Sequence, residues 1–286
     1  MNYRSLAKKG SILTVALWLI ATMAMFGVGL GKLTRTTYQF SRRVKNDFIV
    51  LNAVQAIVSS AIADRESDLT PAYDTLSELQ EEGEYIVGDI KLIYSLKDEG
   101  AKININMVNS SVLKNLPSMD MDKAIAITSS KYRPFYPKEQ ILVLDDIEEE
   151  DYEEIKDLIT VYGNGRININ TCSEEMMGYL ELDDTLISRI IEFRMGEDGE
   201  MYTPDDGVFE SDAAIAGALK EKIYLTEREQ QELNMMAGQR LFSVRSDVYR
   251  IESEAYSAGK SVRKHSVLIG RGKGGGGYRI LEWNEI

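Results

Sequence analysis

Apolar residues follow three different patterns along the chain, and each pattern predicts a different kind of element. A run without any charged side chain extends from Ser11 to Gly31, directly after a short basic leader. Its length is about what one helix needs to cross the hydrocarbon core of a bilayer. Apolar residues then recur in steps of three and four, as in an amphipathic helix. Strand-like alternation appears after residue 84 and again near the C-terminus.

The ten-residue leader that ends at Gly10 carries three basic residues and no acid. A basic flank stays on the cytoplasmic side, so everything after Lys32 is expected outside the cytoplasm. A secretory signal peptide has a shorter apolar core and a small-residue cleavage site, neither of which is present here. A prepilin signal would be cut between Gly10 and Ser11 and would leave the apolar helix on the mature chain. A plain signal anchor is the alternative.

The amphipathic stripe continues the apolar helix beyond the membrane run. Its members are Val44, Phe48, Leu51, Val58 and Ile62, and only Gln55 interrupts the row. We expect one helix over residues 11–68, with residues 11–31 in the membrane and the second half docked on a globular domain. This helix would end before Pro71.

The strand-like segments predict a small β domain that is split in the sequence. We expect a strand in residues 84–100 and further strands within 240–286, with the glycine-rich stretch 272–277 as a hairpin connection. Between them, residues 101–239 have a helical pattern and form an insertion. The expected fold class is α+β, with the long helix packed on a small antiparallel sheet that the insertion interrupts.

The insertion contains an internal repeat, because Ile-Asn-Ile-Asn occurs at residues 103–106 and again at 167–170. Asn109 and Ser173 follow the two copies as expected N-caps of helices. Two related lobes are implied, about 101–163 and 164–239, each resembling a helix-hairpin-helix unit. Their hairpins lack the glycines that approach phosphates and carry carboxylates instead, so nucleic acid is not an expected partner.

Composition narrows the classes of function further. The net charge of −13 argues against nucleic acid and anionic lipid as partners. The single Cys172 excludes an internal disulfide and is expected to be a small packing residue. The single His265, expected on the sheet surface, leaves little room for histidine-based metal or triad chemistry. We therefore expect no enzymatic activity.

Two acidic clusters remain as candidate sites. The cluster at 145–154 stands at an expected helix start, where the helix dipole favours carboxylates. The second cluster lies in a glycine-containing loop at 196–207. Carboxylates on glycine-permitted turns suit Ca²⁺, although the spacing differs from an EF-hand loop. The candidate calcium ligands are Glu197, Asp198, Glu200, Asp205 and Asp206.

Taken together, these features resemble one known family. The prepilin-like leader, the long apolar helix, the split β domain, the two Ile-Asn-Ile-Asn motifs and the closing Leu-Glu-Trp-Asn-Glu of residues 281–285 are similar to the type II secretion minor pseudopilin K family. Most pilins carry glutamate five residues after the cut, which is thought to pair with the N-terminal amine of a neighbouring subunit. Members of family K lack it, and this chain has Val15 there.

The resemblance implies a non-enzymatic subunit at the tip of the pseudopilus, which serves protein secretion across the outer membrane. It implies a single-pass inner-membrane protein with its bulk in the periplasm, processed by prepilin peptidase. Ser11 departs from the Phe or Met that many pilin-like chains have at this terminus, a difference that bears on N-methylation more than on cleavage. The implied partners are minor pseudopilins I and J and the inner-membrane assembly platform, with a secretin or secreted substrates as further contacts. Two alternatives stay open: a minor pilin of a type IV pilus or DNA-uptake system, and a membrane-anchored extracytoplasmic binding domain.

Overall fold

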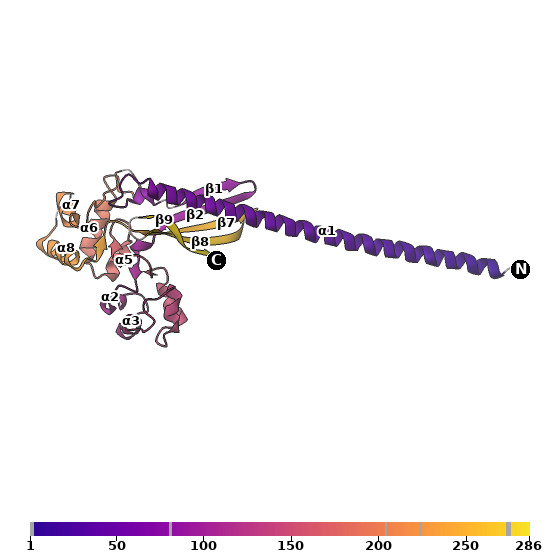
Figure 1. Cartoon of the computed structure of the whole chain (residues 1–286), viewed down its shortest axis with the longest axis horizontal. Coiled ribbons are helices and arrows are strands. Elements are labelled where there is room, and N and C mark those ends of the chain that lie inside the picture. Colours follow the sequence, from indigo (N-terminus) through magenta and orange to yellow (C-terminus); the bar gives the residue numbers. More distant parts are fainter. Residues whose placement is uncertain (1–2, 80–81, 204, 223–224, 273–275) are drawn as a thin grey trace. The chain divides into compact units, whose positions relative to one another are not determined.

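The computed structural model describes residues 3–79, 82–203, 205–222, 225–272 and 276–286. The chain divides into two compact units, Met1–Ala53 and Val54–Ile286. The first unit consists of most of helix α1 (Tyr3–Glu66), and the last turns of this helix belong to the second unit (Figure 1). The leader residues from Tyr3 onward are part of α1, so the helix begins earlier than residue 11 and ends near the expected boundary.

The end of α1 is attached to the globular unit through one of its faces. Val54, Ile57 and Val58 are buried, whereas Gln55 and Ser59 on the same helix are exposed. The guanidinium carbon of Arg65 lies 5.4 Å from the centre of the Tyr249 ring. The carboxylate of Glu66 accepts a hydrogen bond from the Tyr278 backbone N–H at 3.2 Å. The final turns are therefore held by an apolar stripe and by two polar contacts with different strands.

The second unit contains an antiparallel sheet with the strand order β1-β2-β7-β8-β9. The expected single strand after residue 84 was wrong, because this segment forms a hairpin. Its strands pair around a turn at Gly88, whose φ of 59° is readily adopted only without a side chain. The strands are β1 (Gly83–Val87), β2 (Ile90–Asp98), β7 (Val248–Ser257), β8 (Lys260–Gly272) and β9 (Gly276–Glu285).

One face of this sheet is apolar because its residues alternate in register across the strands. Leu92 pairs with Ala255, and Ile251 pairs with Val267, and all four are buried. The glycine-rich connection joins β8 and β9 as an antiparallel hairpin, as expected, and residues 273–275 lie outside the described part. The sheet thus supplies a continuous apolar face from strands at both ends of the sequence.

The helical insertion leaves the sheet after Asp98 and returns at Val248, and Asp98 is the register partner of Tyr249. Its first half contains η2 (Glu99–Ala101), β3 (Ile103–Asn104), α2 (Ser110–Leu113), α3 (Met121–Thr128), η3 (Lys138–Val143), α4 (Glu149–Ile155) and β4 (Ile159–Thr160). Its second half contains β5 (Ile167–Asn168), α5 (Glu174–Tyr179), α6 (Asp184–Arg194), α7 (Ile215–Lys222), α8 (Glu227–Gln239) and β6 (Phe242–Ser243). The 3-10 helix η1 (Leu76–Glu78) precedes the sheet.

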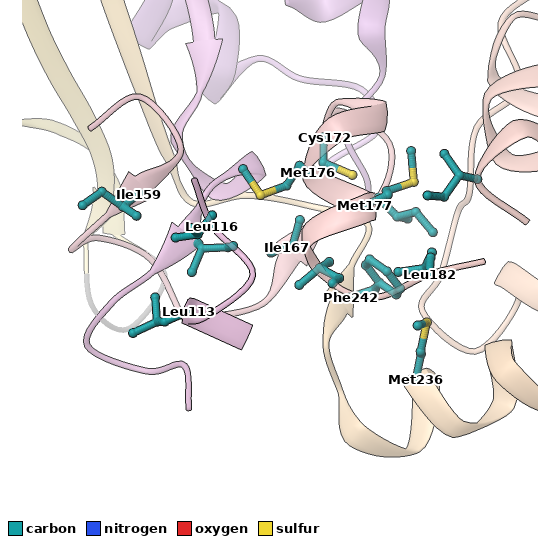
Figure 2. Close-up of a cluster of buried hydrophobic side chains, with 14 of the residues drawn as sticks. Leu113, Leu116, Ile159, Ile167, Cys172, Met176, Met177, Leu182, Met236 and Phe242 are labelled. Carbon is teal, nitrogen blue, oxygen red and sulfur yellow. The ribbon is translucent and has the colours of Figure 1, made fainter. Parts of the chain in front are cut away.

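Each half closes on itself through a short parallel pair of strands. β3 pairs with β4, and β5 pairs with β6. Of the residues 241–244, which were expected as a strand, Phe242–Ser243 form β6 within the insertion, and this strand is outside the main sheet. Buried side chains from both halves form one cluster, in which Leu113 and Leu116 come from the first half and Met176, Met177 and Phe242 from the second (Figure 2). The division into lobes at residues 163 and 164 stays a prediction.

Candidate functional site

The apolar half of α1 carries the expected membrane span and processing site. Within the described residues, one helix, Ile12–Glu66, is long and apolar enough to cross a membrane, with a mean hydropathy of 2.1 in its apolar window. Gly10 and Ser11 lie within the bounds of α1, and their surroundings fall outside the described part of the structure. Val15 is an apolar side chain that is 62% exposed.

The amphipathic stripe behaves differently in its two halves. Val58 is buried and Ile62 is half-buried, as expected of a docked helix. Val44, Phe48 and Leu51 are exposed, with 67% of the Phe48 side chain accessible. An exposed phenylalanine in an apolar row is typical of a surface that another protein or a lipid covers.

The two Ile-Asn-Ile-Asn motifs build the same hydrogen-bonded structure in both halves of the insertion. In the first copy, the side-chain oxygen of Asn106 accepts from the backbone N–H of Phe135 at 2.7 Å, and its amide donates to the Phe135 carbonyl at 3.0 Å. Asn104 turns the chain by accepting from the Asn106 N–H at 2.9 Å. Both isoleucines, Ile103 and Ile105, are fully buried. The motif is thus an asparagine clamp on a buried phenylalanine.

The second copy repeats this clamp at Phe209. Asn170 accepts from the Phe209 N–H at 3.0 Å and donates to its carbonyl at 2.9 Å. The Asn170 amide also lies 3.0 Å from the carbonyl of Asp74 and 3.3 Å from that of Val244. Phe135 and Phe209 are both fully buried. The clamped phenylalanines were not expected, because no repeated sequence surrounds them.

The helix pairs after each motif are capped as expected. Asn109 accepts from Val112 N–H at the start of α2, and Ser173 accepts from Met176 N–H at the start of α5. The hairpin carboxylates of Asp120 and Asp183 cap the second helices, α3 and α6. Asp120 accepts from the Lys123 N–H and Asp183 from the Thr185 N–H, so each carboxylate satisfies a free backbone donor at a helix start.

Two polar junctions connect the insertion with the sheet, and neither was expected from the sequence. At the first, the Glu99 carboxylate accepts two hydrogen bonds from the Arg250 guanidinium, at 3.0 and 3.1 Å, and lies 3.2 Å from the Lys102 ammonium. Burial by itself would raise the pKa of Glu99. The hydrogen bonds and positive charges of Arg250 and Lys102 outweigh burial and lower this pKa to about 2.

At the second junction, the buried carboxylates of Asp74 and Asp98 both accept from the side-chain amide of Asn168, at 2.7 and 2.9 Å. Ser246 joins them, since its N–H donates to Asp74 at 2.7 Å and its hydroxyl to Asp98 at 2.9 Å. Close packing surrounds this network, because a Cβ atom added to Gly100 would lie 2.1 Å from the Ser246 hydroxyl oxygen.

The candidate calcium loop at 196–207 is organised by its own carboxylates. Asp205 accepts from the N–H groups of Glu197 and Asp198, at 2.8 and 3.1 Å, and Asp206 accepts from Tyr202 N–H at 2.9 Å. These bonds lower the pKa of Asp205 to about 2, with the Thr203 hydroxyl as the largest cause. In the part of the chain that the structure describes, no three His, Cys, Asp or Glu side chains are grouped to hold a metal ion.

The calcium site therefore stays a prediction. A bound ion would have to recruit carboxylate oxygens that now serve backbone donors. The other acidic cluster is a helix start, as expected. The Asp151 carboxylate accepts from Glu148 N–H at 3.1 Å and forms an ion pair with Lys123 at 2.7 Å.

The chain's one cysteine and one histidine, the residue types most used for metal binding and nucleophilic catalysis, are both buried. Cys172 is fully buried, as expected of a packing residue, and burial raises the pKa of its thiol to about 11. His265 is also buried, so its expected place on the sheet surface was wrong. Its ring meets that of Trp283 edge-on at 6.2 Å, and burial lowers its pKa. His265 lies two and four residues before Val267 and Ile269 in β8, so it shares their buried face of the sheet.

Comparisons with known proteins identify the fold. No protein-family model matches the chain, and no curated protein does. Among solved structures, a chain of the crystal structure of the GspK-GspI-GspJ complex from the enterotoxigenic Escherichia coli type 2 secretion system is similar to it. The TM-score is 0.55 at 16% sequence identity, over 85% of this chain and 99% of that chain. This chain shares the fold of that protein. The similarity spans nearly the whole of the solved chain and supports the mixed α+β class with a long helix and an antiparallel sheet.

Proposed function

We propose that this chain is a minor pseudopilin of a type II secretion system, placed at the tip of the pseudopilus and acting without enzymatic activity. The observation that carries the proposal is the shared fold with a chain of the GspK-GspI-GspJ complex over 99% of that chain's length. The apolar helix, the exposed Val44 to Leu51 stripe and the bulky insertion support the same role. Such a subunit would be anchored in the inner membrane, with its bulk in the periplasm.

The proposed partners are minor pseudopilins of the I and J type, the prepilin peptidase and the inner-membrane platform. The peptidase would cut between Gly10 and Ser11. The exposed side chains of Val44, Phe48 and Leu51 would pack on the helices of the partner pseudopilins. Val15 supports the tip position, because a subunit without a neighbour above it has no amine to neutralise a buried carboxylate.

The first experiment is the mass of the N-terminus of the chain from membranes, with and without the prepilin peptidase. We expect a product that begins at Ser11 only when the peptidase is present, and no such product from the Gly10→Ala variant. An intact Met1 terminus in both samples would contradict the proposal and favour a membrane-anchored binding domain.

A second experiment separates a pseudopilus from a type IV pilus or DNA-uptake system. Phe48→Cys would be crosslinked in membranes that contain either set of candidate partners, with Arg42→Cys as the control, because Arg42 is exposed but points to another side of the same helix. Crosslinks to I- and J-type pseudopilins from position 48 support the proposal. Crosslinks to pilus subunits alone would overturn it.

A further inference from the structure

The junction between Asp74, Asp98 and Asn168 holds two carboxylates in one buried network. Asp74 is 2% exposed and Asp98 is 6% exposed. Each accepts one of the two N–H bonds of the same Asn168 amide, at 2.7 and 2.9 Å. Two carboxylates that share one neutral donor repel each other when both are ionised, because the donor carries no positive charge to offset theirs.

The surroundings do not neutralise two negative charges. The nearest cation to the pair, among the described residues, is Arg65, whose nitrogen lies 4.0 Å from an oxygen of Asp74. Arg65 also pairs with Glu78 at 3.2 Å, so its single charge faces several carboxylates. The charged or titratable groups around Asp74 are Arg65, Glu66, Asp68, Glu78, Asp98, Arg245, Asp247, Tyr249, Arg271 and Tyr278. One proton on the pair lowers its charge from two negative charges to one.

The hydrogen bonds indicate which carboxylate takes the proton. Asp98 accepts from four donors: the Gly100 N–H, the Asn168 amide and the hydroxyls of Thr171 and Ser246. Asp74 has a different neighbour on its Oδ1 atom, the Tyr249 hydroxyl at 2.7 Å. This hydroxyl also lies 3.0 Å from the Ser246 carbonyl, so it can donate there instead. The Tyr249 oxygen can then accept a hydrogen bond from a protonated Oδ1 of Asp74.

A cavity connects Asp74 with solvent. Its volume is about 200 Å³, and its walls include Asp74, Arg65 and Tyr278 together with the exposed residues Glu66 and Gly277. Water in such a polar cavity can deliver and remove a proton. Asp98 does not line this cavity. Both the hydrogen bonds and the access route therefore point to Asp74 as the exchanging group.

We propose that Asp74 carries a proton when the second half of the insertion is docked on the sheet, and that loss of this proton loosens the junction. The junction is thus a pH-sensitive latch between Asn168 of the insertion, Tyr249 of strand β7 and Ser246, which lies just before that strand. Burial, followed by the charge of Asp98, raises the pKa of Asp74 to about 7. Burial also raises the pKa of Asp98, against the donors that favour its ionised form. This proposal is independent of the secretion role.

The sign of the effect follows from linkage. A carboxyl whose folded pKa is raised binds its proton in the docked state at a pH where the opened state has lost it. The stabilisation is complete below about pH 4 and is lost as the pH rises to about 7. The opening equilibrium constant should rise by up to about tenfold per pH unit across this window and then level off.

Hydrogen exchange of the full chain in detergent micelles tests the latch between pH 4 and 8. Rates at residues 167–171 and 244–246, corrected for intrinsic exchange, are compared between the wild type and Asp74→Asn. The asparagine mimics the protonated acid, because its oxygen can accept from Asn168 while its amide faces the Tyr249 oxygen. We expect the wild-type opening constant to rise with pH relative to Asp74→Asn, which lacks this dependence. Identical pH profiles for the two proteins would overturn the proposal.

Asp98→Asn is the matched control. In either orientation its amide N–H faces another donor, the Gly100 N–H or the Asn168 amide, and one hydrogen bond is lost. Hydrogen exchange at the junction should therefore be faster than in the wild type at every pH. A second measurement does not depend on any variant. The carboxylic acid carbonyl stretch of a buried aspartic acid, followed by infrared difference spectroscopy of the wild type, should disappear as the pH rises through about 7. Absence of such a band at pH 5 would also refute the latch.

Discussion

The two halves of the insertion use the same asparagine clamp in different surroundings. In the first half, Asn104 donates to the backbone carbonyls of Tyr162 and Gly163, so the motif stabilises its own half. In the second half, the equivalent Asn168 donates to two carboxylates from other parts of the chain. The first asparagine of the motif therefore stabilises its own half in one copy, and in the other copy it binds residues that are distant in the sequence. What differs is the partner that meets the first asparagine, whereas the clamp on the phenylalanine is the same.

The two junctions with the sheet differ in the same way. Glu99 is buried with two cations, whereas its neighbour Asp98 is buried with another acid. Adjacent residues in the chain therefore have pKa values that move in opposite directions. The first junction is strengthened by ionisation and the second by protonation, so the insertion is attached through contacts with opposite pH dependence.

The largest expected effect tests the two clamps against each other. Asn170→Ala removes a fully buried clamp with additional carbonyl partners and leaves the Phe209 N–H without an acceptor, so we expect a loss of about 4 kcal/mol. Asn106→Ala, at a half-buried clamp, should cost about 2 kcal/mol. Urea unfolding of the full chain in micelles measures both. Asn52→Ala, at an exposed helix position, is the control. Equal losses of unfolding free energy for the two variants would show that the two clamps contribute equally to stability, against this expectation.

The next effect concerns the first junction. Glu99→Gln should reduce stability at pH 7 by about 3 kcal/mol, because the folded pKa of Glu99 is about 2 instead of the ordinary value near 4.5. A lowered carboxyl pKa stabilises the fold above about pH 4.5, and this contribution is lost as the pH falls toward about 2. The difference in unfolding free energy between wild type and variant should therefore shrink steadily below about pH 4.5 and approach zero only near pH 2. A difference that persists there would assign the effect to packing.

A smaller effect separates the two clamped phenylalanines. Phe209 stacks on Phe193 with ring centres 4.5 Å apart and an interplanar angle of 21°. Phe193→Leu should cost about 1 to 2 kcal/mol through the lost ring contact and imperfect refilling. Hydrogen exchange should accelerate around Phe209 and remain unchanged around Phe135. Equal acceleration at both phenylalanines would show that the two halves respond as one.

The smallest effect is expected at the exposed loop 196–207. Asp205→Asn should loosen this loop, with little change in global unfolding, because the carboxylate accepts from two backbone N–H groups. Its contribution is present above about pH 4 and is lost as the pH falls toward 2. If the predicted calcium site forms, calorimetric titration with Ca²⁺ gives binding that Asp205→Asn removes and the exposed control Asp89→Asn retains. No heat of binding in the wild type would refute the site.

Local sequence patterns predicted those features that depend on neighbouring residues. The apolar run, the strands of the C-terminal sheet and the caps Asn109 and Ser173 were all visible in this way. The hairpin at Gly88 was missed because Val87 and Ile90 make the apolar segment look continuous. The Gly-Asp pair between them was the available signal for a two-residue turn.

The candidate junctions were beyond the reach of pattern reasoning for a physical reason. Asp74 and Asn168 meet although 94 residues separate them, and nothing about an isolated aspartate distinguishes a buried acid from a solvated one. Phe135 and Phe209 likewise lie in loops of unrelated sequence. The repeat itself identified the asparagines, but only the tertiary structure identifies what each one binds.

The point at which the insertion joins the sheet has a consequence for the ancestry of such chains. Asp98 and Tyr249 face each other across one rung of the ladder, so the polypeptide departs and returns at a single place. A two-residue turn such as Asn-Gly would suffice to reconnect β2 and β7 there as an ordinary hairpin. The insertion can therefore be added or removed without any change in which strands of the sheet are neighbours. One recombination event at this rung would convert a short ancestor into a chain of the present architecture.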